Sequence, residues 1–140
     1  MYWMTLPLKR YFDFAGRSRR KEYWMFVLFQ FLVMIVPLFL LLAGLPSEDS
    51  LDSASAGLSS VGIIGAVLIG IIAIGFIIPG IAVQIRRFHD QDKSGWFLLL
   101  GFIPYVGGLI MLVFMLLPGT AGPNRFGPDP KDPSQAGVFE

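Results

Sequence analysis

The chain has 140 residues, of which 54% are hydrophobic and only 15% are charged, and its mean hydropathy is +0.65. A soluble domain of this length has too little interior to enclose so many apolar side chains, so the composition excludes an ordinary soluble globular protein. Cysteine is absent, which excludes a disulfide framework and a thiolate metal site. The net charge of +1 conceals an asymmetry, because residues 1–22 carry six bases and two acids whereas residues 46–60 carry three acids and no base.

The first segment, residues 1–22, mixes basic residues with aromatic ones such as Tyr2, Trp3 and Tyr11. This mixture is typical of a segment that lies in the headgroup layer of a membrane. Cytoplasmic flanks of membrane spans favour Lys and Arg. We therefore expect an amphipathic basic segment and a cytoplasmic N-terminus.

Three runs of 22 or 23 residues without Lys, Arg, Asp or Glu follow: Tyr23–Leu45, Val61–Val83 and Trp96–Leu117. A helix of such length spans roughly 33–35 Å, which is enough to cross a hydrocarbon core of about 30 Å. Because a backbone in lipid must satisfy its own hydrogen bonds, the runs are predicted to be helices. The expected fold class is an all-α integral membrane protein, a compact bundle of three transmembrane segments in a single domain.

The stretches between the runs set the predicted orientation. Residues 46–60 are acidic and should form an external loop, and residues 84–95 carry bases and should form a cytoplasmic charged connector. Residues 118–140 are dense in Pro, Gly and polar residues, so we expect a turn-rich tail without a core of its own.

The third run is interrupted by Pro104, Gly107 and Gly108. Proline removes a backbone donor and clashes with the preceding turn, and paired glycines weaken a helix. We expect one span that is kinked here, which would put the tail outside. The alternative is a re-entrant hairpin of two half-helices, which would leave the tail in the cytoplasm.

The second run carries small residues at every fourth position: Gly62, Ala66 and Gly70. Such a stripe allows two helices to approach closely, and we expect it to pack within the protomer, with homodimerisation as the second choice. The three runs contain no ionisable Asp, Glu, Lys, Arg or His, which argues against a proton- or ion-coupled pump.

The motif "GRSRRKEYW" precedes the first run and supplies Arg17, Arg19 and Arg20. It is read first as a positive-inside signal with an aromatic belt. The sharper hypothesis is a site for anionic lipid headgroups, since guanidinium groups bind phosphate oxygens in bidentate fashion. Nucleic acid is not an expected partner, because one short basic run beside a membrane span is poor support for it.

The motif "RRFHDQDK" holds Arg86, Arg87, His89 and Asp90. The plain interpretation is a connector whose acids pair with its arginines, with Ser94 capping the third helix. A shared binding site is the second interpretation, and proton transfer by His89 with Asp90 is the third. One histidine and two carboxylates without a fourth ligand do not predict a metal site, and no cofactor is expected.

Three motifs in this order resemble the YhaH/YhaI-like family of small bacterial inner-membrane proteins: "FAGRSRRKEYWMF", "RRFHDQDKSGW" and "PGTAGPNRFGPDP". The resemblance implies a multi-pass protein of the bacterial inner membrane and carries over no catalytic residue, because the family's activity is unestablished. The family-like motifs contain these polar or glycine positions: Arg17, Arg19, Arg20, Glu22, Arg86, Arg87, His89, Asp90, Asn124, Arg125 and Gly127.

The function expected from these features is a non-enzymatic membrane protein whose cytoplasmic basic face contacts anionic lipid or a partner protein. A transport or channel component, formed by association of copies of the chain, is the alternative. An enzyme acting on lipid headgroups at the His89–Asp90 pair ranks third.

Overall fold

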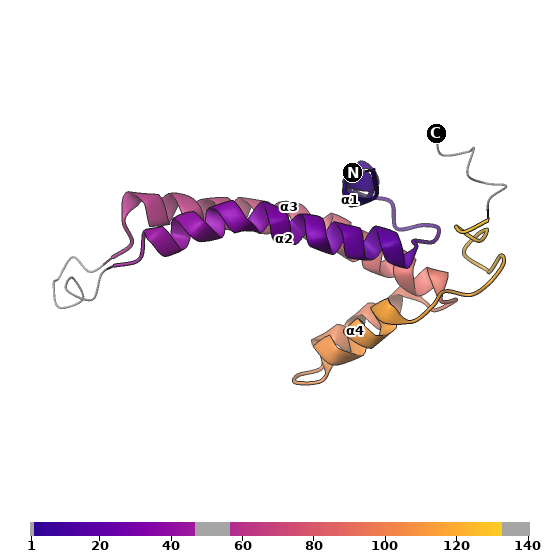
Figure 1. Ribbon diagram of the computed structural model, residues 1–140. Helices are drawn as coiled ribbons and strands as arrows, with labels where there is room; N and C mark the ends of the chain where they lie inside the picture. Colours follow the sequence, from indigo (N-terminus) through magenta and orange to yellow (C-terminus); the bar gives the residue numbers. More distant parts are fainter. Residues whose placement is uncertain (1, 47–56, 133–140) are drawn as a thin grey trace. The chain divides into compact units, whose positions relative to one another are not determined.

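The computed structural model describes residues 2–46 and 57–132, and within these ranges every regular element is a helix (Figure 1). The chain divides into two compact units, one of residues 28–77 and the other of residues 1–27 with 78–140. Most of the predicted external loop falls on residues 47–56, outside the described residues. The elements in chain order are α1 (Tyr2–Lys9), α2 (Arg20–Ala43), α3 (Ser60–Asp90), the 3₁₀ helix η2 (Gly95–Phe102) and α4 (Gly107–Leu116).

Two of these helices, α2 and α3, are long and apolar enough to cross a membrane. Their most apolar 18-residue windows are each only 11% buried. The core helix of a soluble protein would be mostly buried, so outward-facing apolar side chains fit a lipid environment instead. The described residues are thus consistent with a helical membrane protein.

The predicted connector of residues 84–95 is partly helical. α3 has 31 residues and continues through Asp90, so it is about 46 Å long and exceeds a hydrocarbon core of about 30 Å. Its last turns therefore extend beyond the apolar run, and they carry Arg86 and Arg87 on a rigid helix. Ser94 begins η2 as predicted, since its hydroxyl accepts a hydrogen bond from the Trp96 amide at 3.4 Å.

Within the unit of residues 28–77, α2 and α3 lie side by side and antiparallel (Figure 1). Glycine brings the two backbones together: a Cβ added to Gly65 would lie 2.4 Å from the Leu41 nitrogen and 2.7 Å from the Pro37 oxygen. A Cβ added to Gly62 would lie 3.0 Å from the Cα of Gly44. The rings of Phe29 and Phe76 meet edge to face with centroids 6.0 Å apart.

The packing stripe expected at Gly62, Ala66 and Gly70 needs correction. Gly62 lies in the contact, but Ala66 and Gly70 are exposed, and a Cβ added to Gly70 meets nothing within 4 Å. The contact instead runs from Gly62 to Gly65. Residues three and four apart both lie on one side of a helix, so the spacing of small residues did not identify the face that packs.

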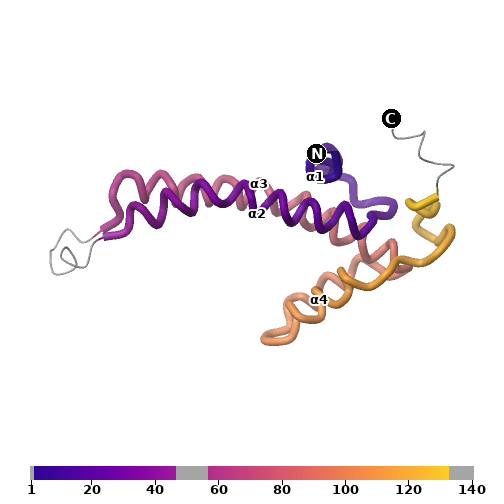
Figure 2. Tube along the Cα trace, in the orientation of Figure 1, coloured from indigo at the N-terminus to yellow at the C-terminus, as the bar shows by residue number. Residues whose placement is uncertain are grey.

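The third predicted segment, residues 96–117, is not the single kinked helix that was expected, because it forms two short helices, η2 and α4. η2 ends at Phe102, the chain reverses, and α4 packs back against η2 (Figure 2). Pro104 and Tyr105 lie at the reversal, where Tyr105 has φ +67°. A Cβ on Gly107 would lie 2.5 Å from the Gly101 oxygen, so glycine is required for the two halves to pack this closely.

Gly65→Ala should destabilise the α2–α3 hairpin, because the new methyl group has to push the α2 backbone away. We expect a loss of about 1–3 kcal/mol in the free energy of unfolding, measured by thermal unfolding in detergent micelles with circular dichroism. Gly70→Ala is the matched control, since it gains the same helix propensity without a clash. Equal midpoints for the two variants would contradict the packing described.

Candidate functional site: a buried arginine–carboxylate cluster

Seven polar side chains are buried in the unit of residues 1–27 and 78–140. We call them the arginine cluster: Arg17, Ser18, Glu22, Arg86, Arg87, Asp90 and Gln91. They come from the segment before α2, the first turn of α2, the end of α3 and the residue that follows it. A buried charge needs an ion pair and hydrogen bonds to be tolerated.

The cluster lies where α4 ends. The last carbonyl groups of a helix have no partner within the helix and carry a partial negative charge. Here the Phe114 oxygen accepts from Gln91 Nε2 at 2.5 Å, the Leu116 oxygen accepts from Arg20 Nη1 at 3.2 Å, and the Leu117 oxygen accepts from Arg87 Nη2. Side chains from α2 and from the end of α3 therefore cap α4.

The end of α3 is capped by the tail. The Asp90 carbonyl accepts from the Thr120 amide at 2.8 Å and from the Thr120 hydroxyl at 3.1 Å. The His89 carbonyl accepts from Asn124 Nδ2 at 2.8 Å. Two helix C-termini, those of α3 and α4, thus meet in the same small region and are satisfied by side chains from other segments.

Arg17 connects three segments of the chain. Its Nε donates to Asp90 Oδ1 at 3.0 Å, and its two terminal nitrogens donate to the carbonyls of Thr120 at 2.6 Å and Gly122 at 2.7 Å. The other oxygen of Asp90 accepts from Arg87 Nη1 at 2.6 Å. One carboxylate thereby holds two arginines, and one arginine joins the N-terminal segment to α3 and to the tail.

Arg86 binds a second set of partners, in the segment before α2 and in the first turn of α2. Its Nη2 pairs with Glu22 Oε1 at 3.2 Å, its Nε donates to Ser18 Oγ at 2.9 Å, and its Nη1 donates to the Asp13 carbonyl. The Ser18 amide returns a hydrogen bond to the Arg86 carbonyl at 3.1 Å. This reciprocal pair fixes the segment before α2 against the last turns of α3.

The charges within the cluster nearly balance. Three buried arginines face two buried carboxylates, Glu22 and Asp90, which leaves one positive charge. Each helix C-terminus contributes about half a negative charge, so the ends of α3 and α4 together offset it. The composition of the cluster is thus explained by the two helix ends that it encloses.

Two carboxylates outside the helices, those of Asp13 and Asp129, are influenced by arginines of the cluster. Partial burial works to raise the pKa of Asp13, but the hydrogen bond and the charge of Arg10 outweigh it, so the pKa is lowered. Backbone N–H groups of Lys131 and Gly122 lower the pKa of Asp129. Because both folded-state values lie below the unfolded ones, these groups stabilise the fold at neutral pH and lose that effect as the pH falls.

The sequence-predicted site residues separate into two groups. The structure brings Arg17, Arg86, Arg87 and Asp90 together, with their side chains 2% exposed or less. These guanidinium groups are occupied by the chain's own oxygens and present no open surface for a headgroup.

The other predicted site residues lie outside the cluster. Arg20 is exposed, and Arg19 stacks over the Trp3 ring at 5.5 Å. His89 does not share the Asp90 carboxylate: its Nδ1 lies 3.2 Å from the Gly16 oxygen, and its ring stacks on Phe126 at 3.9 Å.

Several contributors were not singled out from the sequence, above all Gly119, Thr120 and Gln91. Gly119 packs directly on Asp90, since an added Cβ would lie 1.9 Å from its Oδ2. Their place in the chain could have identified them, because Gln91 closely follows the paired arginines and "PGTAGPN" directly follows the last apolar run.

The arrangement is suited to fastening chain segments together. Its guanidinium groups and carboxylates are bonded to one another, to the Ser18 hydroxyl or to backbone carbonyls. Among the described residues, the buried polar side-chain atoms left without a partner are Arg87 Nε and Gln91 Oε1. The same part of the chain contains no group of three His, Cys, Asp or Glu side chains that could hold a metal ion.

Asp90→Asn should strongly destabilise the protein, because it leaves Arg17 and Arg87 buried without a carboxylate. Breaking a buried ion pair from one side costs about 3–5 kcal/mol. The control is Asp92→Asn, which removes the exposed pair with Arg125 and should cost no more than about 1 kcal/mol. Urea unfolding in detergent micelles measures both, and similar losses would show that the cluster does not carry the stability assigned to it.

Gly119→Ala should detach the tail from the end of α3. Asp90 is held by two arginines and cannot move away from the new methyl group, so the tail has to shift instead. The measurement is limited trypsin digestion, in which cleavage after Arg125 should accelerate by about tenfold for a loss of about 1.4 kcal/mol. Gly108→Ala, where an added Cβ meets nothing within 4 Å, should leave the rate unchanged.

Comparison with known proteins places these residues in a family. Residues 11–128 match the family described as "Protein of unknown function (DUF805)". The chain is 45% identical over 131 residues to Inner membrane protein YhaH of Escherichia coli (strain K12), covering 94% of this chain and 98% of that protein. It is 39% identical over 132 residues to Inner membrane protein YhaI of the same strain, covering 94% and 97%.

A more distant relative is Uncharacterized protein YiiR of E. coli (strain K12), 27% identical over 146 residues that cover 86% of this chain and 88% of that protein. No solved structure matches the chain. The family match contains every residue of the arginine cluster and the tail residues bound to it, and the chain belongs to the family described as "Protein of unknown function (DUF805)".

Proposed function

We propose that this chain is a non-enzymatic, integral protein of the bacterial inner membrane whose surface bases contact anionic lipid headgroups. Two similar proteins, YhaH and YhaI, are named inner membrane proteins, and α2 and α3 are apolar enough to cross a membrane. The basic residues that serve this contact are those outside the arginine cluster.

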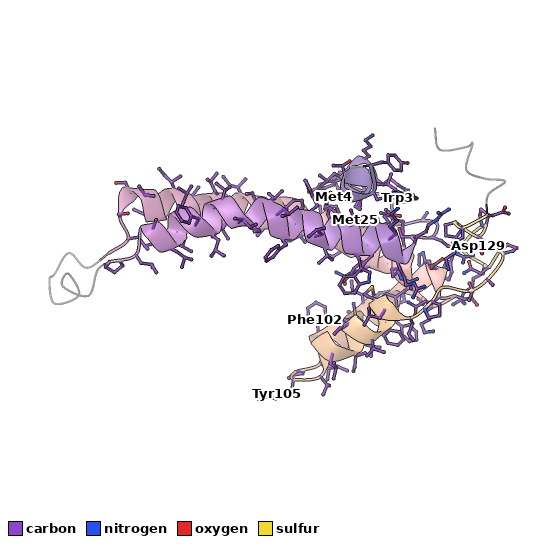
Figure 3. The ribbon with its side chains drawn as sticks, viewed as in Figure 1. Trp3, Met4, Met25, Phe102, Tyr105 and Asp129 are labelled. Carbon is purple, nitrogen blue, oxygen red and sulfur yellow. The ribbon has the colours of Figure 1, made fainter. Side chains whose placement is uncertain are left out.

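The observation that carries the proposal is the basic and aromatic surface at the start of α2. Arg19 and Lys21 both lie over the ring of Trp3, at 5.5 and 5.6 Å, so α1 and the beginning of α2 share one surface (Figure 3). We call this surface the basic patch; its bases are Lys9, Arg19 and Lys21, of which Lys9 and Lys21 are exposed. Bases beside tryptophan at the end of an apolar helix fit the interface between hydrocarbon and headgroups.

The arginine cluster contributes to this function indirectly. Arg17 and Arg86 fix the segment of residues 10–19 against the end of α3. That segment connects α1 to α2, so its fixed path holds α1 beside the first turn of α2. A preordered basic surface binds with a smaller loss of conformational entropy than a flexible one.

The distribution of charge supports a cytoplasmic position for the basic patch. Six bases precede the first apolar run, which favours a cytoplasmic N-terminus. The basic patch would then face the cytoplasmic leaflet, where anionic lipids produce a negative surface potential. A membrane partner protein with an acidic surface would bind through the same residues, and a second copy of the chain is a further partner within this proposal.

The transport or channel alternative receives less support from the described residues. The groove between α3 and the η2–α4 hairpin has a volume of about 260 Å³. It is lined mainly by apolar side chains: Ile81, Gln84, Leu98, Gly101, Phe102 and Met111. Water-filled and ion-conducting paths need polar lining, so a pore would have to form between copies of the chain.

The double variant Lys9→Gln/Lys21→Gln should weaken the preference for anionic lipid while leaving the arginine cluster intact. Each base near an anionic surface contributes about 1 kcal/mol, so the association constant for phosphatidylglycerol relative to phosphatidylcholine should fall by about fivefold per residue. Spin-labelled lipids and electron paramagnetic resonance of the reconstituted protein provide the measurement.

Lys131→Gln is the matched control, because Lys131 is an exposed base of the tail. It should change the lipid preference less than either replacement in the basic patch. A wild-type protein with no preference for phosphatidylglycerol would refute lipid contact and leave a partner protein as the ligand of the patch.

A further inference from the structure

We infer that the hairpin formed by η2 and α4, residues 95–116, enters one leaflet of the bilayer and returns to the side from which it came, with lipid chains covering its exposed apolar surface. This inference concerns a membrane contact that is separate from the basic patch. It leaves α2 and α3 as the two helices that cross the membrane.

The two ends of the hairpin are held at one place. Immediately before it, Asp90 pairs with Arg17 and Arg87. Immediately after it, the carbonyls of Leu117 and Thr120 accept from the same two arginines. These side chains are buried, so the end of α3, the start of the tail and the N-terminal segment lie on one side of the membrane. A segment with both ends on one side cannot be a span.

The length of each half fits a leaflet. η2 has 8 residues and α4 has 10, which gives each a length of about 15–16 Å. The hydrocarbon core is about 30 Å thick, so each half reaches only the middle of the bilayer. Neither half could cross alone, whereas the pair can descend and return.

From its base, the first half of the hairpin runs alongside α3 toward the apolar part of that helix. An added Cβ on Gly95, at the base, would lie 3.0 Å from the Ile85 side chain. Further toward the tip, Phe102 lines the same groove as Ile81, one turn earlier in α3. η2 therefore runs antiparallel to α3, from the polar end of that helix toward its apolar run.

The surface of the hairpin is apolar on the outside. Residues 96–117 contain no charged side chain. The large exposed side chains include Trp96, Leu99, Phe102, Leu109, Leu112, Val113 and Leu116. A continuous apolar surface of this kind is unstable in water. Lipid is favoured as its cover, because the hairpin base adjoins the end of a helix that is itself apolar and exposed.

The turn at the tip fits a hydrocarbon environment because its backbone donors are largely satisfied within it. The amides of Ile103, Val106 and Gly107 donate to carbonyls of residues 100–104 at 3.3, 2.8 and 2.8 Å. Pro104 has no N–H to satisfy. Irregular backbone at membrane depth is tolerated only when such groups have partners. Figure 3 shows Phe102 and Tyr105 at this end of the hairpin, remote from Asp129 in the tail.

The first test determines on which side of the membrane the tail lies, and the natural lack of cysteine makes it direct. Single cysteines replace Lys9, Gly57 and Lys131, and intact and lysed cells are treated with a membrane-impermeant thiol reagent. Lys9→Cys and Gly57→Cys mark the two sides. Lys131→Cys should label like Lys9→Cys. Labelling like Gly57→Cys would mean that residues 96–117 cross the membrane and would overturn the inference.

The second test measures the depth of the tip with spin labels on Tyr105→Cys and Trp96→Cys, both exposed positions. In liposomes, collisions with oxygen should exceed collisions with a water-soluble nickel chelate more strongly at residue 105 than at residue 96. Equal, shallow values would mean that the hairpin lies flat on the surface or in water. Poor access of both reagents to residue 105 would mean that protein covers the tip. Either result would overturn insertion into lipid.

Discussion

The structure depends on the meeting of two helix C-termini. α3 ends at Asp90 and α4 ends at Leu116, and both ends are brought to the same region of the chain. Each end presents carbonyl groups without helical partners and about half a negative charge. In an apolar chain beside a membrane such groups cannot be left unpaired. Arg87 donates to the end of α4, Thr120 and Asn124 donate to the end of α3, and the Asp90 carboxylate pairs with Arg17 and Arg87.

This cluster specifies connectivity more than it adds net stability. Buried ion pairs gain little over well-packed apolar side chains, because removing the charges from water is costly. Their hydrogen bonds are directional, however, so only one arrangement satisfies all of them. The hydrogen bonds of Arg17 are compatible with only one path for the segment before α2 and for the tail. The hydrogen bond from Arg86 likewise fixes the position of Ser18. An apolar contact at the same place would permit several registers.

The basic residues of the N-terminal part and of the charged connector divide into a buried group and a surface group. Three of the five arginines in the motifs "GRSRRKEYW" and "RRFHDQDK" are enclosed and bonded to the chain itself: Arg17, Arg86 and Arg87. The bases that remain for a membrane surface or a partner are Lys9, Arg19, Arg20 and Lys21, which lie at or near the surface around α1 and the start of α2. In the proposed function, the first group positions the second.

The sequence by itself determined the lipid-compatible character of the chain, because charge-free apolar runs longer than 20 residues are typical of helices that lie in lipid. It also favoured pairing between the arginines and the acids of the charged connector, as the first of three interpretations of that motif. It could not determine which charges pair, because Arg17 and Asp90 are 73 residues apart and meet only after the chain has folded. Nor could it distinguish a kinked span from a hairpin at Pro104, since both break the helix at the same residue. The tertiary structure has a hairpin there, and at its base Arg17 and Arg87 bind the Asp90 carboxylate before the break and the carbonyl groups of Thr120 and Leu117 after it.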